Sequence, residues 1–247
     1  MKKILLAGAA LALISANPVL AADLPARTYT KAPVYKAPEA VYNWTGFYIG
    51  ANGGYGWGQT NWLFSPAMTT ANHSTSGGLA GGQVGYNWQT SSNWVLGVEA
   101  DGDWANIKGS TLCPNPFFTC GTNVRDLASF RGRVGYAAGP VLFYGTGGVG
   151  YANTAYTALP PGVPPFVFTG NYNTDQWGYA AGAGIEYGFT PNWSAKLEYM
   201  HYGFGTVDAP MGTLSATNVS ALRLNIDTVK VGVNYRFGWG SPVVAKY

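Results

Sequence analysis

The segment Trp177–Phe189 reads WGYAAGAGIEYGF, and its side chains alternate between two classes. The odd positions are apolar or aromatic, whereas the even positions are glycine apart from Ala180 and Glu186. A two-residue period is typical of a β-strand, which directs successive side chains to opposite faces of a sheet. The segment therefore predicts a strand with one large apolar face and one face of very small residues.

Seven further runs show the same alternation, so we expect eight strands in all. These runs lie near residues 46–57, 79–89, 94–103, 125–136, 141–151, 193–202 and 222–237. In the last run the apolar phase reverses over 222–226, and we expect a bulge or a strand start near Asp227 for that reason.

The connections between the runs alternate in length. The short ones lie at about 90–93, 138–140 and 190–192, and the long ones at about 58–76, 105–123, 153–175 and 203–220. Short turns at one end and long loops at the other are typical of an up-and-down barrel in an outer membrane. The sequence therefore predicts an all-β fold: an eight-stranded antiparallel up-and-down transmembrane β-barrel.

The composition agrees with a protein whose surface does not face water alone. Charged residues make up 10% of the chain, against roughly 25% in an average soluble domain. The chain also holds 35 Gly, 9 Trp, 17 Tyr and 11 Phe, and this aromatic content argues against disorder. No basic cluster indicates a nucleic-acid partner.

The N-terminus has the organisation of a secretory signal peptide. Lys2 and Lys3 precede the apolar run 4–16, which is too short to span a membrane, and Ala21 provides a small residue for cleavage. We therefore expect a signal peptide at 1–21, a flexible proline-containing arm at 22–43, the barrel at 44–237 and a C-terminal tail at 238–247.

The residue types predict which strand face meets lipid. Glycine dominates the polar face, and small residues suit the narrow lumen of an eight-stranded barrel. Aromatic residues cluster near both ends of the apolar face, as the two aromatic girdles of a membrane barrel do. We therefore expect the apolar face outside, in the outer membrane; a soluble barrel of lipocalin type is the alternative.

Charged residues on the inward face are expected to pair. They are Glu99, Asp101, Asp103, Glu186 and Glu198 among the acids and Arg125, Arg131, Arg133, Lys196, Lys230 and Arg236 among the bases. An unpartnered buried charge costs several kcal/mol, so a narrow lumen favours a network of salt bridges that plugs it. The alternative is an ion-conducting pore or a gate.

Other residues with chemical potential give weaker signals. Cys113 and Cys120 lie close together in an exported chain, which predicts one local disulfide. The run 145–150 (GTGGVG) matches a dinucleotide-binding motif, but no helix is expected after it, so we interpret it as strand. We expect His73 and His201 to be exposed loop residues; axial ligation of hemin is the alternative. We identify no catalytic, metal-binding or cofactor-binding residues and expect no enzyme.

Several separated motifs resemble one family in its own order. They are YNWTGFYIGANGGYGWG at 42–58, LASFRGRVGY at 127–136, LFYGTGG at 142–148, VKVGVNYRF at 229–237 and ADLP at 22–25. The chain resembles the small outer-membrane surface-antigen barrels of alphaproteobacteria, also called porin-family proteins. The resemblance implies a barrel related to the transmembrane domain of outer membrane protein A, exposed at the cell surface, with porin-like or hemin-binding activity in some members.

The end of the barrel resembles a further family feature. Lys230, Gly232, Tyr235 and Phe237 resemble the C-terminal signal that the barrel-insertion machinery recognises, although the chain continues beyond Phe237. Taken together, we expect a monomeric structural barrel that serves envelope integrity and surface interaction. Its expected partners are the outer-membrane bilayer, the insertion machinery and a candidate surface ligand such as hemin, with a narrow porin-like channel or hemin receptor as the alternative function.

Overall fold

The computed structural model of the chain describes residues 42–65, 69–159, 170–208 and 219–237. The expected signal peptide, residues 22–41 of the expected arm and the expected tail 238–247 lie outside the described residues. Within these described ranges, no helix has the length and apolar character needed to cross a membrane.

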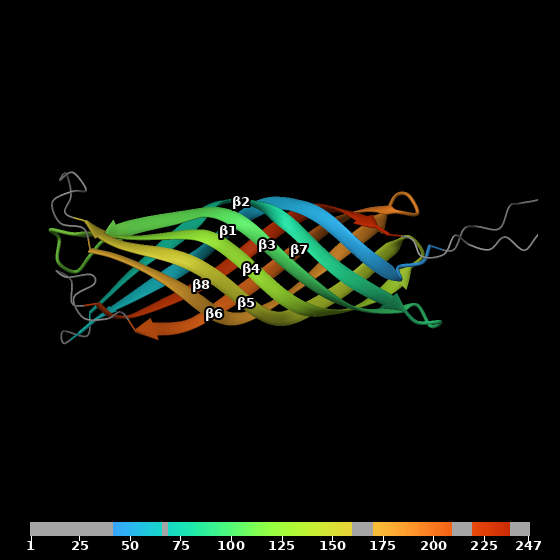
Figure 1. Ribbon diagram of the computed structural model, residues 1–247. Coiled ribbons are helices and arrows are strands. Elements are labelled where there is room, and N and C mark those ends of the chain that lie inside the picture. The colour runs from blue at the N-terminus through green and yellow to red at the C-terminus, as the bar shows by residue number, and fades with distance from the viewer. Residues whose placement is uncertain (1–41, 66–68, 160–169, 209–218, 238–247) are drawn as a thin grey trace, which may run out of the picture. The chain divides into compact units, whose positions relative to one another are not determined.

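Eight long antiparallel strands close into a barrel (Figure 1). In chain order they are β1 (Gly46–Phe64), β2 (Thr69–Gln89), β3 (Trp94–Leu112), β4 (Thr119–Ala138), β5 (Val141–Leu159), β6 (Gly170–Gly188), β7 (Trp193–Asp208) and β8 (Val219–Arg236). Each strand pairs with its neighbours in the chain, and β1 pairs with β8 to close the ring. The predicted eight-stranded up-and-down fold is confirmed.

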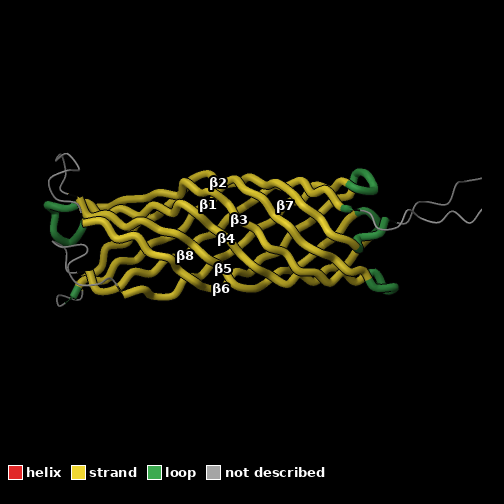
Figure 2. Tube along the Cα trace, in the orientation of Figure 1, coloured by secondary structure: helices red, strands yellow, loops and turns green. Residues whose placement is uncertain are grey.

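Tight turns lie at one end of the barrel, which we call the turn end, and the opposite end is the loop end (Figure 2). The turns join β2 to β3, β4 to β5 and β6 to β7, where short connections are predicted. Two of them hold a residue with positive φ, Asn93 at 65° and Gly139 at 61°. Glycine and asparagine adopt positive φ more readily than other residues, so these two positions hold residue types that favour the observed turns.

The wall nearest the turn end carries large apolar side chains on its outside. Two rows of exposed aromatic residues bound this region, one including Phe47, Trp94, Phe143 and Tyr187 and the other including Tyr55, Trp104, Tyr151 and Trp177. Exposed valine, isoleucine and leucine residues fill the space between the rows. We call this region the lipid-facing band, because an apolar belt between aromatic girdles matches a bilayer.

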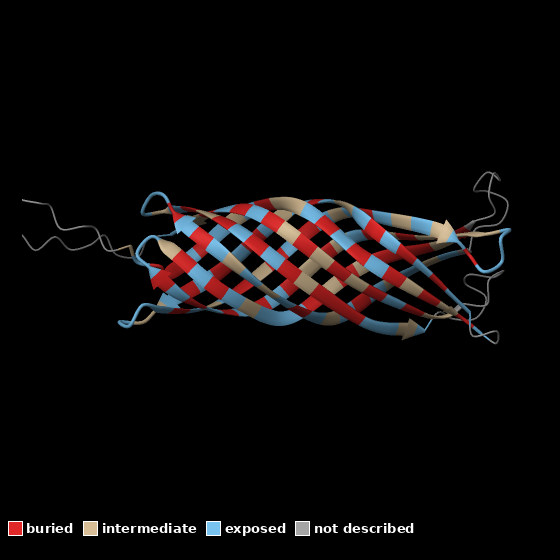
Figure 3. Cartoon of the chain, turned by 180° about the vertical axis from the view of Figure 1, so that it is seen from behind, coloured by how far each residue is buried: buried red, intermediate tan, exposed pale blue. Residues whose placement is uncertain are grey.

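The strands continue well past the second aromatic row. In this part of the barrel the apolar side chains face the lumen and the polar side chains face outwards. In β8, Leu222, Leu224 and Ile226 are fully buried in the lumen, while Arg223 and Asn225 lie on the outside. We call this part of the barrel the outer extension; it comprises residues 58–64, 69–77, 105–112, 119–127, 152–158, 171–176, 202–208 and 220–226. Figure 3 shows buried and exposed residues alternating along the strands.

The outer extension corrects two predictions. Most of the residues expected in the long loops are strand: β1 reaches Phe64, for example, and β2 begins at Thr69. The expected bulge or strand start near Asp227 is also wrong, since β8 begins at Val219 and its pairing with β1 and β7 runs through Asp227 without a shift. The apolar phase reverses because the outside becomes polar and the lumen apolar, while the backbone continues unchanged.

The two regions are expected to respond differently to an added charge. Val231→Lys, in the lipid-facing band, should lower the free energy of unfolding by about 2–4 kcal/mol, because it places an ammonium group in hydrocarbon. Asn225→Lys, in the outer extension of the same strand, should cost no more than about 1 kcal/mol. Urea unfolding of the barrel in lipid vesicles measures both, and equal losses would contradict the assignment of the band.

Candidate functional site

A network of buried ion pairs fills the lumen inside the lipid-facing band, and Arg131 lies at its centre. The Arg131 Nη2 atom lies 2.6 Å from Glu99 Oε1, 2.9 Å from Asp101 Oδ1 and 3.2 Å from Glu198 Oε1. The register explains the first contact, since Arg131 of β4 is paired directly with Glu99 of β3. The guanidinium is fully buried, so these carboxylates take the place of water around it.

Two lysines extend the network across the lumen. Lys196 of β7 places Nζ 2.9 Å from Glu99 Oε1, on the carboxylate that Arg131 also contacts. Lys230 of β8 places Nζ 2.7 Å from Asp101 Oδ2 and 3.0 Å from Asp103 Oδ2. The acids of β3 are therefore held by cations from both β4 and the far strands, which ties opposite walls of the barrel together.

A second arginine joins the network on the side of β6. The Arg133 Nη2 atom lies 2.8 Å from Glu186 Oε2, and its guanidinium lies 3.8 Å from the centre of the Tyr144 ring. The Tyr144 hydroxyl in turn donates a hydrogen bond of 3.0 Å to Glu198 Oε2. Charge, aromatic ring and hydroxyl are thus combined in one layer, and Glu186 and Glu198 each have more than one partner.

Glycines make room for the tyrosines of this layer. The Tyr48 hydroxyl donates a hydrogen bond of 2.7 Å to Glu99 Oε2, and it lies where a side chain on Gly85 would begin. Tyr144 lies over Gly184 in the same way. Larger residues at these two positions would collide with the tyrosines, which explains why the inward face alternates glycine with long side chains.

Nine of the eleven expected lumen charges meet in this network, and Arg125 and Arg236 do not. Arg125 is exposed, because the register of β4 shifts between Val124 and Asp126 and so changes the alternation. Arg236 lies at the turn end, where its Nη2 donates a hydrogen bond of 2.6 Å to the carbonyl of Pro191. A single-residue register shift leaves no clear sign in the alternation of the sequence.

The chain before β1 fills the lumen at the turn end. Trp44 is buried there against Leu142 and Tyr144, and its Nε1 donates a hydrogen bond of 3.3 Å to the carbonyl of Gly139. The guanidinium of Arg236 lies 4.5 Å from the centre of the Tyr42 ring. Sequence reasoning missed this role, because Tyr42 falls at the end of the expected arm and has no periodic context.

Two apolar clusters fill the lumen of the outer extension, and the one nearer the ion pairs also includes Leu79, Ala180 and Met200 at the edge of the lipid-facing band. The cluster nearer the ion pairs consists of Leu79, Ile107, Val124, Leu127, Ala152, Ala180, Met200, Tyr202, Phe204, Leu224 and Ile226. The cluster nearer the loop end consists of Trp62, Phe64, Ala71, Cys113, Cys120, Tyr156, Ala158 and Leu222. The expected disulfide between Cys113 and Cys120 is present in the second cluster. Neither cluster was predicted from the sequence. The reversal of the apolar phase over 222–226 was the feature that could have indicated them.

Both histidines lie in strands and not in exposed loops as expected. His73 is buried in the outer extension, with Nε2 3.0 Å from Thr122 Oγ1 and its ring 6.4 Å from that of Trp62. Burial lowers the pKa of His73 below its ordinary value. His201 lies on the outside of β7, where its Nδ1 is 2.7 Å from Asp227 Oδ1.

The other motifs add no chemistry to the site. Residues 145–150 lie within β5, as expected for a strand glycine run. Across the described residues, no group of three or more His, Cys, Asp and Glu side chains has the geometry to hold a metal ion. Of the expected insertion signal, Lys230 belongs to the ion-pair network, Phe237 is exposed, and recognition by the machinery stays a prediction.

Comparison with known proteins gives matches along nearly the whole chain. The family model of the outer membrane protein beta-barrel domain matches residues 8–237. The 31 kDa outer-membrane immunogenic protein of Brucella melitensis is 33% identical, over 96% of this chain and 100% of its own length. The 22 kDa outer membrane protein of Rhizobium leguminosarum is 30% identical, over 79% of each chain. The crystal structure of OprG from Pseudomonas aeruginosa aligns with 79% of this chain and 97% of its own, at 12% identity and a TM-score of 0.43.

Removing the central cation should destabilise the barrel strongly. Arg131→Met leaves Glu99, Asp101 and Glu198 without their shared partner, and breaking a buried ion pair from one side costs about 3–5 kcal/mol. Arg125→Met is the matched control, because an exposed arginine contributes within about 0.5 kcal/mol. Urea unfolding in vesicles compares the two variants, and similar losses would show that the network is not structural.

The burial of His73 predicts a dependence of stability on pH. Because burial lowers the pKa of folded His73, the unfolded chain binds more protons as the pH falls through about 6.5. Stability should therefore be full above that pH and decline below it. His73→Gln, which keeps a hydrogen-bonding group near Thr122, should reduce the difference between urea midpoints at pH 8 and pH 5. An unchanged difference in the variant would contradict this role for His73.

Proposed function

The chain belongs to the family of outer membrane protein β-barrel domains, and from that premise we propose that it is a structural surface protein whose own side chains close its lumen. Its setting is the outer membrane, with the bilayer around the lipid-facing band. On this proposal the protein contributes to envelope integrity and presents its loop end for surface interaction. It neither conducts solutes nor catalyses a reaction.

The filling of the lumen at three successive levels is the observation that carries this proposal. Trp44 and Arg236 occupy the turn end, the ion-pair network around Arg131 occupies the band, and the two apolar clusters occupy the outer extension. The side chains of Arg131 and Asp101 are 0% exposed, which supports a network whose centre water does not reach. An ion crossing the barrel would have to displace all three levels.

The energetics of the network also favour a closed lumen. Moving Arg131 out of the lumen would leave three carboxylates in a narrow, low-dielectric space. Breaking buried pairs of this kind costs several kcal/mol, which keeps an open state rare unless new partners replace the lost ones. The same interactions stiffen the wall, since they join β3 and β4 to β7 and β8.

The burial of His73 favours the structural role over a hemin receptor. Axial ligation requires an accessible imidazole nitrogen that can reach the iron. His73 is buried among Trp62 and Thr122, whereas His201 is part-exposed and contacts Asp227 through Nδ1 alone, so the hemin test depends mainly on His201. A Soret shift on adding hemin that His73→Ala or His201→Ala abolishes would favour the receptor instead.

The disulfide-linked tip offers a surface for interaction. Phe117 is 73% exposed at the loop end between Cys113 and Cys120, and Leu112 beside the disulfide is 61% exposed. Exposed large apolar residues at a stapled tip are suited to anchor a partner. The Brucella relative is named an immunogenic protein, and we extend surface exposure to this chain by analogy.

Electrical recording in planar bilayers tests whether the lumen is closed. The folded wild-type protein should show no steady unitary channels, because the three filled levels leave no continuous path. Trp44→Ala should remain silent as well, since the ion-pair network and the apolar clusters persist. Steady channels in the wild type whose conductance changes with Glu99→Gln, Asp101→Asn or Arg131→Met would overturn the proposal and establish a narrow porin.

A further inference from the structure

A layer of polar side chains crosses the lumen of the outer extension between its two apolar clusters. We call it the polar layer, and its members are Thr60, His73, Thr75, Thr122, Thr154 and Gln176. On β4, Thr122 lies between Val124 of the cluster nearer the ion pairs and Cys120 of the cluster nearer the loop end. Thr154 of β5 and His73 of β2 lie between members of the same two clusters. Apolar side chains therefore cover the polar layer on both sides.

Six buried side-chain atoms at this level have no hydrogen-bonding partner among the described residues. They are Thr60 Oγ1, Trp62 Nε1, His73 Nδ1, Thr75 Oγ1, Thr154 Oγ1 and Gln176 Oε1. The residues that carry these atoms are at most 8% exposed. A buried polar group without a partner costs free energy, and nearly all such groups in folded proteins bind protein or ordered water. The six atoms therefore indicate an occupant that forms hydrogen bonds.

The residues that carry the six atoms are close together in the lumen. Thr60 of β1 is paired directly with His73 of β2, whose Nε2 lies 3.0 Å from Thr122 Oγ1 of β4. The centre of the Trp62 ring lies 6.4 Å from that of His73 and 5.7 Å from that of Tyr156. The six atoms therefore surround one shared space and do not lie in separate places.

Hydrogen bonds within the layer identify which atoms remain free. Gln176 Nε2 donates a hydrogen bond of 2.7 Å to the Tyr156 hydroxyl, which leaves the carbonyl Oε1 of Gln176 as a free acceptor. His73 contacts Thr122 through Nε2, which leaves Nδ1 free. Trp62 Nε1 can only donate, whereas each threonine hydroxyl can donate and accept. The free atoms thus need a partner that both donates and accepts hydrogen bonds.

The side chains of the polar layer favour a small and neutral occupant. None of its six members is an acidic residue, a lysine or an arginine, so a metal ion or an anion would find no opposite charge there. Four members are threonines, whose short side chains leave space that longer residues would fill. Water is neutral, donates and accepts hydrogen bonds, and occupies buried spaces that are lined by polar groups.

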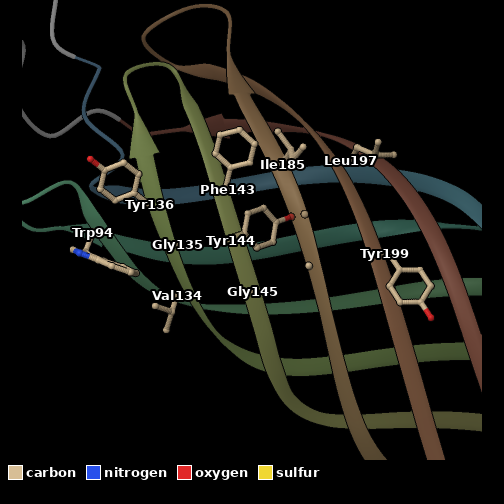
Figure 4. Close-up of a pocket in the computed structure, with 12 residues that line it drawn as sticks. Trp94, Val134, Gly135, Tyr136, Phe143, Tyr144, Gly145, Ile185, Leu197 and Tyr199 are labelled. Carbon is tan, nitrogen blue, oxygen red and sulfur yellow. The ribbon is translucent and has the colours of Figure 1, made fainter.

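A hollow on the outer wall has the opposite chemistry. It measures about 590 Å³ and lies in the lipid-facing band, with Trp94, Tyr136 and Phe143 among the residues around it (Figure 4). None of the residues lining it is charged, and none of them carries one of the six free atoms. Hydrocarbon of the bilayer can fill an apolar hollow, whereas the polar layer requires hydrogen bonds.

We propose that the polar layer binds a small cluster of ordered water molecules, enclosed between the two apolar clusters. A buried water molecule makes about three hydrogen bonds, so the six atoms suit about two to three waters that also bind one another. The waters join β1 and β2 to β5 and β6, whereas the ion-pair network joins β3 and β4 to β7 and β8. The two sets of contacts together connect all eight strands across the lumen.

Radiolytic footprinting of the full-length protein, folded in detergent, tests the proposal. X-rays convert water into hydroxyl radicals, which oxidise side chains next to the water from which they form, and mass spectrometry measures the oxidation. Trp62 and Tyr156 should be oxidised although both are 0% exposed, because the enclosed waters adjoin them. Phe204, which is 1% exposed and lies in the apolar cluster nearer the ion pairs, should be oxidised several-fold less after correction for its intrinsic reactivity. Oxidation of Trp62 and Tyr156 no greater than that of Phe204 would overturn the proposal.

Matched variants separate enclosed waters from water that enters when the loop end opens transiently. Thr60→Val combined with Thr154→Val removes two hydroxyls and keeps the side-chain shape, so the oxidation of Trp62 should fall several-fold. Thr228→Val is the control, since its hydroxyl is also fully buried and unpaired among the described residues but lies outside the polar layer. It should leave the oxidation of Trp62 unchanged. Equal oxidation of Trp62 in the double variant and the wild type would overturn the proposal, and so would an equal fall in Thr228→Val.

A crystal structure of the wild-type protein gives a check that needs no variant. Water density should lie within hydrogen-bonding distance of Trp62 Nε1, His73 Nδ1 and Gln176 Oε1. Direct pairing of these atoms with protein groups, without water between them, would also overturn the proposal.

Discussion

The narrow bore of an eight-stranded barrel is the constraint on which the rest of the structure depends. Eight strands enclose a lumen just wide enough for side chains to fill, so every inward residue must fit against those of the opposite wall. The chain meets this constraint by setting glycine against long residues, as Gly85 lies against Tyr48 and Gly184 against Tyr144. Filling the lumen is therefore part of folding, and the closure that we propose follows from the same packing.

The solvent outside the wall decides what fills the lumen at each level. Within the lipid-facing band the outside is apolar, and the inside holds the charged groups around Arg131 and Lys230. In the outer extension the outside is polar, and the inside holds an apolar core like that of a soluble barrel. One continuous strand such as β8 thus serves two environments, and its pairing runs through Asp227, where the environment changes, without a shift. This apolar core stabilises the loop end of the barrel, where no bilayer surrounds the wall.

The strand number and most of the ion-pair network could be predicted from the sequence, but the position of the membrane boundary and the long-range contacts could not. The two-residue period predicted eight strands, and inward acids and bases predicted most of the ion-pair network. The two-residue period could not show where the wall leaves the membrane. Leu222 and Leu224 belong to the same kind of alternation as the lipid-facing residues, but their side chains point into the lumen. Nor could the period show the register shift that places Arg125 outside, or the packing of Trp44 into the turn end, since both depend on contacts between distant segments.

The most direct test of the proposed closed lumen is a measurement of how far its charged side chains are in contact with mobile water. Nuclear magnetic resonance of the barrel in bilayers can measure magnetisation transfer from water to the guanidinium of Arg131 and the ammonium of Lys196 and Lys230. A sealed network predicts slow transfer to these groups, much slower than to exposed Lys108. Rapid transfer to all three buried cations would reveal a continuous water path and contradict the account.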